Sequence, residues 1–224
     1  SLGNLFGFGE IYLGFWGIPF TIFCVVGMIN AFNMIDGLNG LCASLCLVCF
    51  IAIIYMINAD TVPSLFPLIL PVGAITGFLM YNLGVLGYQR TVFLGDNGSN
   101  ALGFMCAWIL VYFSSVENSN FAPVTALWFV TIPFLDAVGV MASRAIKGIM
   151  PLRPGRDHLH HRLLDMGLSS NTIYLVLIFV SVLLAAIGYI FNYIFPESHY
   201  ISFYAFIILW LCYHFLTRYV SKIV

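Results

Sequence analysis

The sequence predicts an all-α fold, a polytopic membrane helix bundle with about seven transmembrane helices. Of its 224 residues, 62% are hydrophobic and only 8% are charged, whereas a soluble domain carries about 25% charged residues. The mean hydropathy is +1.02, and long apolar runs recur along the whole chain. The composition excludes a soluble globular protein, and we expect one integral membrane domain over residues 1–224.

Seven apolar segments have the length of about 20 residues that a helix needs to cross a bilayer. They are 11–32, 41–59, 64–86, 99–116, 122–143, 172–195 and 200–217. Prolines occur inside several of them, and membrane helices tolerate proline where neighbouring groups satisfy the backbone. We therefore expect all seven segments to be helical.

Small residues in the first spans indicate where helices pack. The second span carries Cys42, Cys46 and Cys49 towards one side. Because free cysteine behaves as a small hydrophobe, we interpret these thiols as packing residues. The third span contains Gly73 and Gly77, a spacing that is typical of close contact between membrane helices.

The fifth span contains Asp136, the only charged residue inside any span. A bare carboxylate in the bilayer costs on the order of 3 kcal/mol or more, so it usually faces a cavity or a partner. Arg144 follows eight positions later and is the expected neighbour. A structural ion pair and a direct catalytic role both remain open.

The basic residues all fall in alternate gaps between the spans. They are Arg90, Arg144, Lys147, Arg153, Arg156, Arg162, Arg218 and Lys222. The positive-inside rule makes this side cytoplasmic, which places the N-terminus outside and the C-terminus in the cytoplasm. The polar loops 33–40, 87–98 and 144–171 share this side. We expect them to form one site beside the lipid headgroups.

The first loop, NMIDGLNG, presents Asn33, Asp36 and Asn39 at three-residue spacing. On a helix this spacing places the three side chains on roughly one face. They would offer oxygen ligands or hydrogen bonds to a substrate. Capping of the two flanking helices is the alternative.

The second loop ends in FLGDNGSN, residues 93–100, where a span begins at Asp96. Gly95 and Gly98 permit close backbone approach, and free N–H groups at a helix start favour phosphate. Asp96 would hold Mg²⁺, which prefers carboxylate oxygen together with substrate phosphate. A simple helix N-cap is the alternative interpretation.

The third loop contains HLHH, which supplies His158, His160 and His161 near Arg153 and Arg156. Imidazole and guanidinium donors suit phosphate oxygens, and arginine binds them bidentately. This favours a diphosphate or nucleotide site. A zinc site and a basic patch on anionic headgroups remain alternatives. With a divalent metal nearby to polarise a phosphoryl oxygen, the three loops together indicate phosphoryl chemistry on a lipid.

Three motifs, in this order, resemble the polyprenyl-phosphate N-acetylhexosamine-1-phosphate transferase family. They are NAFNMIDGLNGL (30–41), VFLGDNGS (92–99) and DHLHHRLLDMG (157–167). The stretch PVTALWFVTIPFLD (123–136) is similar to the branch that transfers GlcNAc-1-phosphate to undecaprenyl phosphate. The resemblance covers nearly the whole chain. It implies that a UDP-sugar donates its sugar-1-phosphate to a lipid phosphate, which yields a lipid-linked diphosphate sugar and UMP.

The resemblance also implies residue roles. Magnesium would be held by Asp96 and Asn39, and Mn²⁺ would be a substitute. The catalytic residues would be Asp36, Asn39, Asp96, His160 and His161.

Substrate binding is implied for a further set of residues, and Phe93 in that set would stack on the uracil. The set is Asn33, Asn82, Phe93, Gly98, Ser99, Arg153, Arg156 and His158.

The expected partners are the UDP-sugar, undecaprenyl phosphate and membrane lipids, with a homodimer as a further expectation and no nucleic acid. The expected setting is the bacterial inner membrane, with the site on the cytoplasmic face. The reaction would be the first membrane step of O-antigen or related surface-glycan synthesis.

The chain departs from the family pattern at several points. Asn39 and Gly155 stand where many members carry an acidic residue, and the chain contains no adjacent pair of aspartates. Because it begins at Ser1, we expect it to be the C-terminal two-thirds of such a transferase. A truncated non-catalytic fragment is one alternative. A transporter is another, although its polar groups would more often lie near the bilayer midplane.

Overall fold

The computed structural model describes the whole chain except residues 58–64, 88, 90, 116–120, 152–154 and 221–224. The described residues form helices and contain no strand. The helices are η1 (Gly14–Trp16), α1 (Gly17–Ile35), α2 (Leu41–Met56), α3 (Phe66–Asn82), α4 (Gly95–Ser115), α5 (Pro123–Phe129), α6 (Thr131–Ile146), α7 (Leu159–Asp165), α8 (Ser170–Ile194) and α9 (His199–Val220). The predicted all-α fold is confirmed.

The number of clear membrane spans is smaller than the seven predicted. Within the described part of the chain, three helices are long and apolar enough to cross a membrane: Gly14–Ile35, Ser170–Ile194 and His199–Thr217. The bent pair α5 and α6 would make a fourth. Helices α2 and α3 are apolar but have only 16 and 17 residues, and α4 begins with the polar residues GDNGSN.

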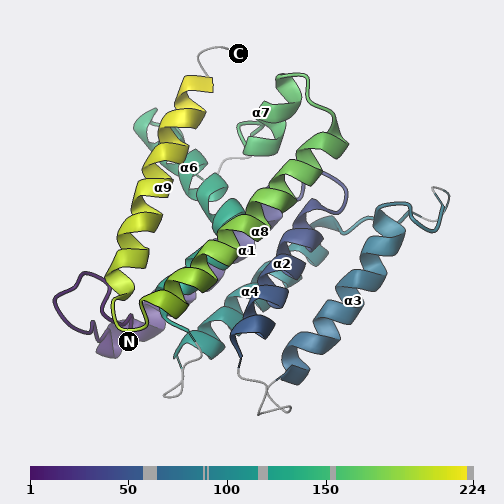
Figure 1. The fold of residues 1–224 in the computed structure, drawn as a ribbon. Helices are drawn as coiled ribbons and strands as arrows, with labels where there is room; N and C mark the ends of the chain where they lie inside the picture. The colour runs from purple at the N-terminus through teal and green to yellow at the C-terminus, as the bar shows by residue number, and fades with distance from the viewer. Residues whose placement is uncertain (58–64, 88, 90, 116–120, 152–154, 221–224) are drawn as a thin grey trace.

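The predicted continuous span 122–143 is wrong in one respect, because the chain bends by 89° between α5 and α6. The break lies at Val130, whose backbone dihedrals (φ −121°, ψ 26°) are not helical. Pro133 follows in the first turn of α6, where a missing backbone N–H costs nothing because that group would have no helical partner. After the bend, α6 packs against α1 and runs behind α9 in the view of Figure 1.

Helix α2 forms the centre of the core and packs against α8, α3 and α4. Cys42, Cys46 and Cys49 are fully buried there, as expected for packing residues. The Cys46 thiol lies 3.3 Å from the thiol of Cys106 on α4. All six cysteines are free.

Close helix contacts occur at different glycines from those predicted. Nothing lies within 4 Å of a Cβ built at Gly73 or Gly77, so the expected packing motif in α3 makes no such contact among the described residues. A Cβ at Gly103 on α4 would instead lie 2.8 Å from the Cα of Ile29 on α1. This close approach along α1 and α4 brings the end of α1 beside the start of α4.

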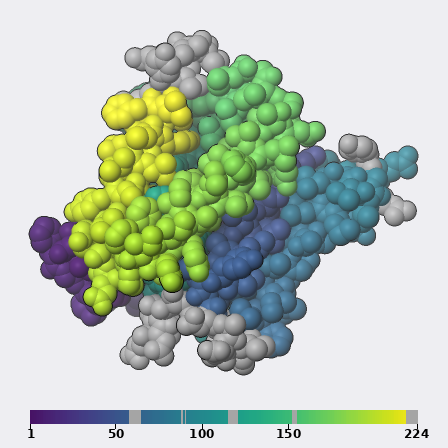
Figure 2. Space-filling view, viewed as in Figure 1, coloured from purple at the N-terminus to yellow at the C-terminus, as the bar shows by residue number. Residues whose placement is uncertain are grey.

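The two ends of the helix bundle are formed by different segments of the chain. Figure 1 shows the N-terminus and the α8–α9 turn at one end, with α7 and the end of helix α9 at the other. In the space-filling view of Figure 2, α8 and α9 cover the visible face, while α2 and α3 lie beside them. The starts of α2 and α4 and the end of α3 gather around the polar pocket described below.

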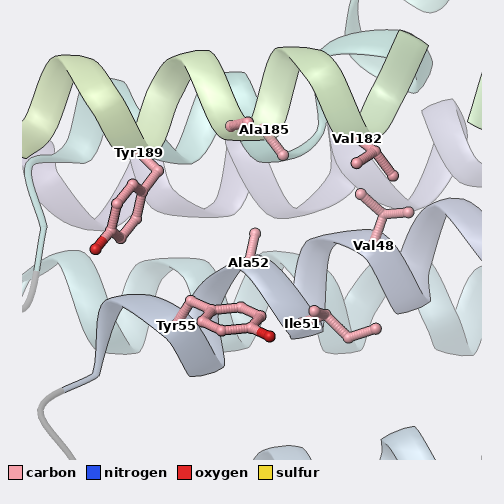
Figure 3. Close-up of a pocket in the computed structure, with 8 residues that line it drawn as sticks. Val48, Ile51, Ala52, Tyr55, Val182, Ala185 and Tyr189 are labelled. Atoms are coloured by element: carbon pink, nitrogen blue, oxygen red, sulfur yellow. The ribbon is translucent and has the colours of Figure 1, made fainter. Parts of the chain in front are cut away.

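An apolar groove of about 430 Å³ runs between α2 and α8. In Figure 3, Val182, Ala185 and Tyr189 of α8 point towards Val48 and Ala52 of α2. The groove contains no acidic or basic side chain, so the chemistry must lie elsewhere.

Candidate active site

A polar pocket of about 270 Å³ joins the α1–α2 turn to the start of α4. Its lining residues are Asp36, Gly37, Leu38, Asn39, Gly40, Ala43, Phe78, Asn82, Phe93, Leu94, Gly95 and Asp96. Two of the three loops predicted to meet therefore share one cavity.

The α1–α2 turn places Asp36 and Asn39 at the pocket, but not on a helix face as predicted. Helix α1 ends at Ile35, and Asp36 is its C-cap residue with ψ 52°. Gly40 then takes the left-handed conformation with φ 76°, which only glycine adopts without strain. The chain reverses within this short turn, so both polar side chains are presented by a loop.

Asp96 lies in the first turn of α4 and lines the same pocket as Asp36. Partial burial, and then the negative charge of Asp96, raise the pKa of Asp36 to about 6. The charge of Asp96 thus disfavours ionisation of Asp36, and a cation beside the two carboxylates would offset this repulsion. The pocket is therefore suited to a positively charged ligand.

The amide of Asn82 also faces this region. Its Nδ2 donates to the carbonyl oxygen of Val92 at 2.7 Å, while its buried Oδ1 accepts no hydrogen bond from any described residue. A buried acceptor without a donor carries a desolvation cost of about 1–3 kcal/mol. Phe93, which also lines the pocket, exposes 77% of its surface.

Asn33 and Ser99, both predicted to bind substrate, hydrogen-bond to each other. The Nδ2 of Asn33 donates to Ser99 Oγ at 3.0 Å, and this bond ties α1 to α4 beside Asp96. A Cβ at Gly98 would lie 2.6 Å from Leu94 Cδ1. In this structure Asn33, Gly98 and Ser99 shape the helix start, and they lie outside the pocket lining.

The third loop reaches the same turn through His160 on α7. The His160 ring is buried, and a Cβ at Gly37 would fall only 2.0 Å from its Nε2. Within the part of the chain that the structure describes, neither ring nitrogen has a hydrogen-bond partner. Burial first, and then the neighbouring charge of His161, lower the His160 pKa to about 4, so the ring is neutral at neutral pH.

His158 is held by Asp136, and this corrects the prediction that Arg144 is the partner of Asp136. The His158 Nδ1 lies 2.8 Å from Asp136 Oδ2, and the backbone N–H of Leu159 donates to Asp136 Oδ1 at 2.7 Å. Arg144 instead donates through Nε to Asp157 Oδ2 at 2.9 Å. Although partial burial alone would raise the pKa of Asp157, its hydrogen bond from Arg144 and the nearby cationic charge hold it below the usual range.

Gly155 lies in a confined space. A Cβ there would lie 2.7 Å from Arg144 Nη2 and 2.8 Å from Asp157 Oδ1. The ion pair between Arg144 and Asp157 therefore occupies the room that a side chain at position 155 would need. Sequence reasoning missed Asp157, since no spacing rule connects it to an arginine on the preceding helix.

The remaining predicted residues are placed as follows. His161 packs ring to ring with His160, with centroids 4.2 Å apart, and burial followed by the charge of Arg156 lowers its pKa. Arg156 itself is exposed, and Arg153 lies outside the described residues. Among the described residues, no three His, Cys, Asp or Glu side chains gather as a metal site, which gives the zinc alternative no support.

Comparison with known proteins places the chain in a family. Residues 1–114 match the model of glycosyl transferase family 4. The chain is 38% identical over 226 residues to the undecaprenyl-phosphate alpha-N-acetylglucosaminyl 1-phosphate transferase of Escherichia coli K12, covering 99% of this chain and 60% of that protein. The equivalent protein of Salmonella typhi is 36% identical over the same shares. That of Haemophilus influenzae is 36% identical over 84% of this chain and 53% of its own length.

The chain thus spans about 60% of the length of the Escherichia coli relative. The family match covers half of the chain and includes both the Asp36 turn and the Asp96 loop. The chain therefore belongs to glycosyl transferase family 4.

Proposed function

We propose that the protein containing this chain transfers GlcNAc-1-phosphate from UDP-GlcNAc to undecaprenyl phosphate. The observation that supports this most directly is the convergence of Asp36, Asp96 and His160, from three distant loops, around one turn. The relatives named above are transferases of this sugar phosphate to this lipid.

A magnesium ion fits the donors of the pocket. The carboxylate of Asp96 and the amide oxygen of Asn39 are the ligands that we propose, with Asp36 beside them. Mg²⁺ is usually held by one or two carboxylates and completes its shell with water and substrate phosphate, so a third acidic ligand is unnecessary. When bound, it would polarise a phosphoryl oxygen and offset the charge that develops during transfer.

In the proposed reaction, an oxygen of the lipid phosphate attacks the phosphorus that bears the sugar. A new P–O bond forms there, and the bond from this phosphorus to the oxygen of the UMP phosphate breaks, so UMP leaves with the electron pair. The exposed Phe93 ring would stack on the uracil. The neutral His160 and His161 would donate hydrogen bonds to the diphosphate without trapping the anionic product by charge.

The site would lie at the cytoplasmic face of the bacterial inner membrane, with the N-terminus of this chain outside. The alternation of basic gaps along the sequence supports this orientation, although Arg90, Arg153 and Lys222 lie outside the described residues. We also propose that α2, α3 and α4 cross the membrane beside the longer helices. The lipid-linked product would then enter synthesis of O-antigen or a related surface glycan.

The test is a membrane assay of the protein expressed from its complete open reading frame. Membranes receive radiolabelled UDP-GlcNAc, undecaprenyl phosphate and Mg²⁺, and labelled lipid is measured. We expect Asp96→Asn to lower turnover at least about 100-fold, the scale on which loss of a preorganised charge group acts. Ser202→Ala is the matched control, because it removes the buried hydrogen bond from Trp128 far from the pocket, and it should retain activity.

Three outcomes would count against the proposal. If folded wild-type protein formed no labelled lipid, the non-catalytic alternative would be favoured. If Asp96→Asn turned over normally, the magnesium assignment would fail. If EDTA left the wild-type rate unchanged, no divalent ion would take part.

A further inference from the structure

The buried carboxylate of Asp136 has no role in the reaction proposed above, although it is costly to bury. Only 1% of its surface is exposed, and it lies on α6, inside the bent pair that would span the membrane. An uncompensated charge in such a place would be strongly destabilising. Its hydrogen-bond partners therefore indicate which structural role offsets the cost of burying this carboxylate.

Those partners lie at the beginning of α7 and on α9. Oδ2 lies 2.8 Å from His158 Nδ1, Oδ1 accepts the Leu159 backbone N–H at 2.7 Å, and the hydroxyl of Tyr213 on α9 donates to Oδ1 at 3.4 Å. Two of the three bonds are thus made to the first residues of α7. Asp136 therefore links the N-terminal end of α7 to α6.

A carboxylate also selects one tautomer of His158. An ionised carboxylate only accepts hydrogen bonds, so the facing Nδ1 must carry a proton. Nε2 is then the free nitrogen of the ring, as an acceptor in the neutral form or a second donor in the charged form. Buried carboxylates orient imidazoles in this way around many catalytic centres.

The same anchor sets the position of His160, two residues later. The rings of His158 and His160 are stacked, with centroids 6.2 Å apart and an angle of 10° between their planes. The His160 ring in turn rests on Gly37, next to Asp36. A continuous set of contacts therefore leads from Asp136 through the start of α7 to the polar pocket.

Other bonds hold α7 but do not touch an imidazole. Arg162 donates from Nε to the Asp157 carbonyl at 2.8 Å and from Nη1 to the Thr217 carbonyl at 3.0 Å. Arg144 holds the Asp157 side chain. These anchors fix the backbone around α7, while Asp136 also fixes the orientation of a histidine ring.

From this geometry we infer that Asp136 is a positioning residue for transfer, which orients His158 and sets α7 so that His160 meets the Asp36 turn. The inference rests on the proposed function for its kinetic consequence. It assigns no contact between Asp136 and substrate. Asp136 acts through the histidines of α7.

Asp136→Asn is the informative variant, because it keeps the size of the side chain and an oxygen for the Leu159 N–H. Its Nδ2 would face His158 Nδ1 as a donor, which forces the imidazole proton to Nε2, the opposite tautomer. We expect kcat/KM for UDP-GlcNAc to fall about 10- to 100-fold, as for other groups that orient a catalytic histidine. The KM for undecaprenyl phosphate should stay within about twofold of the wild type.

Three further proteins complete the kinetic experiment: His158→Ala, the double variant and the control Ser202→Ala. Because Asp136 acts through His158, adding Asp136→Asn to His158→Ala should cause little additional loss. A purely structural carboxylate would give additive losses and affect both substrates. Ser202→Ala loses a buried interhelical hydrogen bond and should leave both kinetic constants unchanged.

Hydrogen–deuterium exchange of the purified protein tests the anchoring without any assay of transfer. Amides of Leu159–Asp165 should exchange faster in Asp136→Asn and His158→Ala than in the wild type or Ser202→Ala. Unchanged protection of α7 in Asp136→Asn would overturn the inference, whether or not the wild type turns over. Faster exchange of α7 with wild-type kinetics would also overturn it. If α7 is protected from exchange in the wild type as expected but the wild type makes no lipid product, only the proposed function would be refuted.

Discussion

Two aspartates of this chain are both withdrawn from water, but their surroundings are opposite. Asp136 is surrounded by donors: an imidazole, a backbone N–H and a phenol. The Asp36 carboxylate accepts no hydrogen bond from any described residue, and burial together with the charge of Asp96 raises its pKa to about 6. One carboxylate is satisfied by the protein, whereas the other is not.

This difference in surroundings separates a carboxylate that stabilises the fold from one that is suited to binding a ligand. A paired and hydrogen-bonded buried charge supports the structure around it, and breaking the pair is costly. Two neighbouring carboxylates without donors destabilise the fold until a cation or a proton arrives. We therefore expect the same chemical change, Asp to Asn, to have opposite effects on stability at the two positions.

The largest expected effect concerns activity after Asp36→Asn. Removal of this charge should lower lipid-product formation at least about 100-fold, since it changes the electrostatics where transferred phosphate would bind. The melting temperature without Mg²⁺ should stay equal or rise, because the repulsion from Asp96 is relieved. Asp136→Asn should instead lower the melting temperature by a few degrees.

Parallel scanning calorimetry and turnover measurements on both variants would check this pair of outcomes. If Asp36→Asn melted earlier than Asp136→Asn, the carboxylate of Asp36 would be a structural group. In that case the comparison drawn above would be wrong.

A second, smaller effect is expected from Gly37→Ala, which tests the contact between the pocket turn and α7. The new methyl group would need the space of the His160 ring, whose Nε2 lies 2.0 Å from the Cβ position. We expect a loss of about tenfold in kcat/KM for the donor and a stability cost of about 1–3 kcal/mol from overpacking.

Gly73→Ala is the matched control for this substitution. Nothing lies within 4 Å of its Cβ position on α3, and alanine in a helix is favoured over glycine by about 0.5–1 kcal/mol. Denaturation midpoints should therefore move in opposite directions for the two variants. Equal activity in both would mean that His160 does not need its place against Gly37.

Much of this arrangement could be predicted from the sequence because hydropathy and charge position act over long stretches. The apolar segments marked the helices, and the alternation of charge along the chain was enough to assign Asp36, Asp96 and His160 to one end of the bundle. In the structure Asp36 and Asp96 line one pocket, and the His160 ring lies against Gly37 of the same turn. Their chemical roles stay predictions.

The wrong predictions concern features that neither the mean hydropathy of a segment nor the spacing of residues along a helix can show. The mean hydropathy of 122–143 does not reveal the bend at Val130, because the segments on both sides of it are apolar. The spacing of Gly73 and Gly77 shows that they share a helix face but not that another helix packs there. Asp136 was assigned to Arg144 from helical proximity, whereas the chain returns through α7 and presents His158.

The smallest expected effect is the contribution of Asp36 to the pH dependence of stability. Its pKa of about 6 in the folded protein lies above the value of about 3.9 for an unperturbed aspartate, so the folded state binds the proton more tightly. The penalty for ionising Asp36 is therefore absent below about pH 4 and fully present above about pH 6. Because this side chain is only partly buried, solvent reduces the effect. His160, whose pKa is lowered to about 4, acts in the opposite direction over the same window, so the Asp36 contribution is measured as the difference between the wild type and Asp36→Asn. Without Mg²⁺, the melting temperature of Asp36→Asn should gain about a degree or two on the wild type as pH rises through this window, whereas Gly73→Ala should keep the wild-type slope. An unchanged slope in Asp36→Asn would assign the titration to another group and remove the electrostatic contrast between the two aspartates.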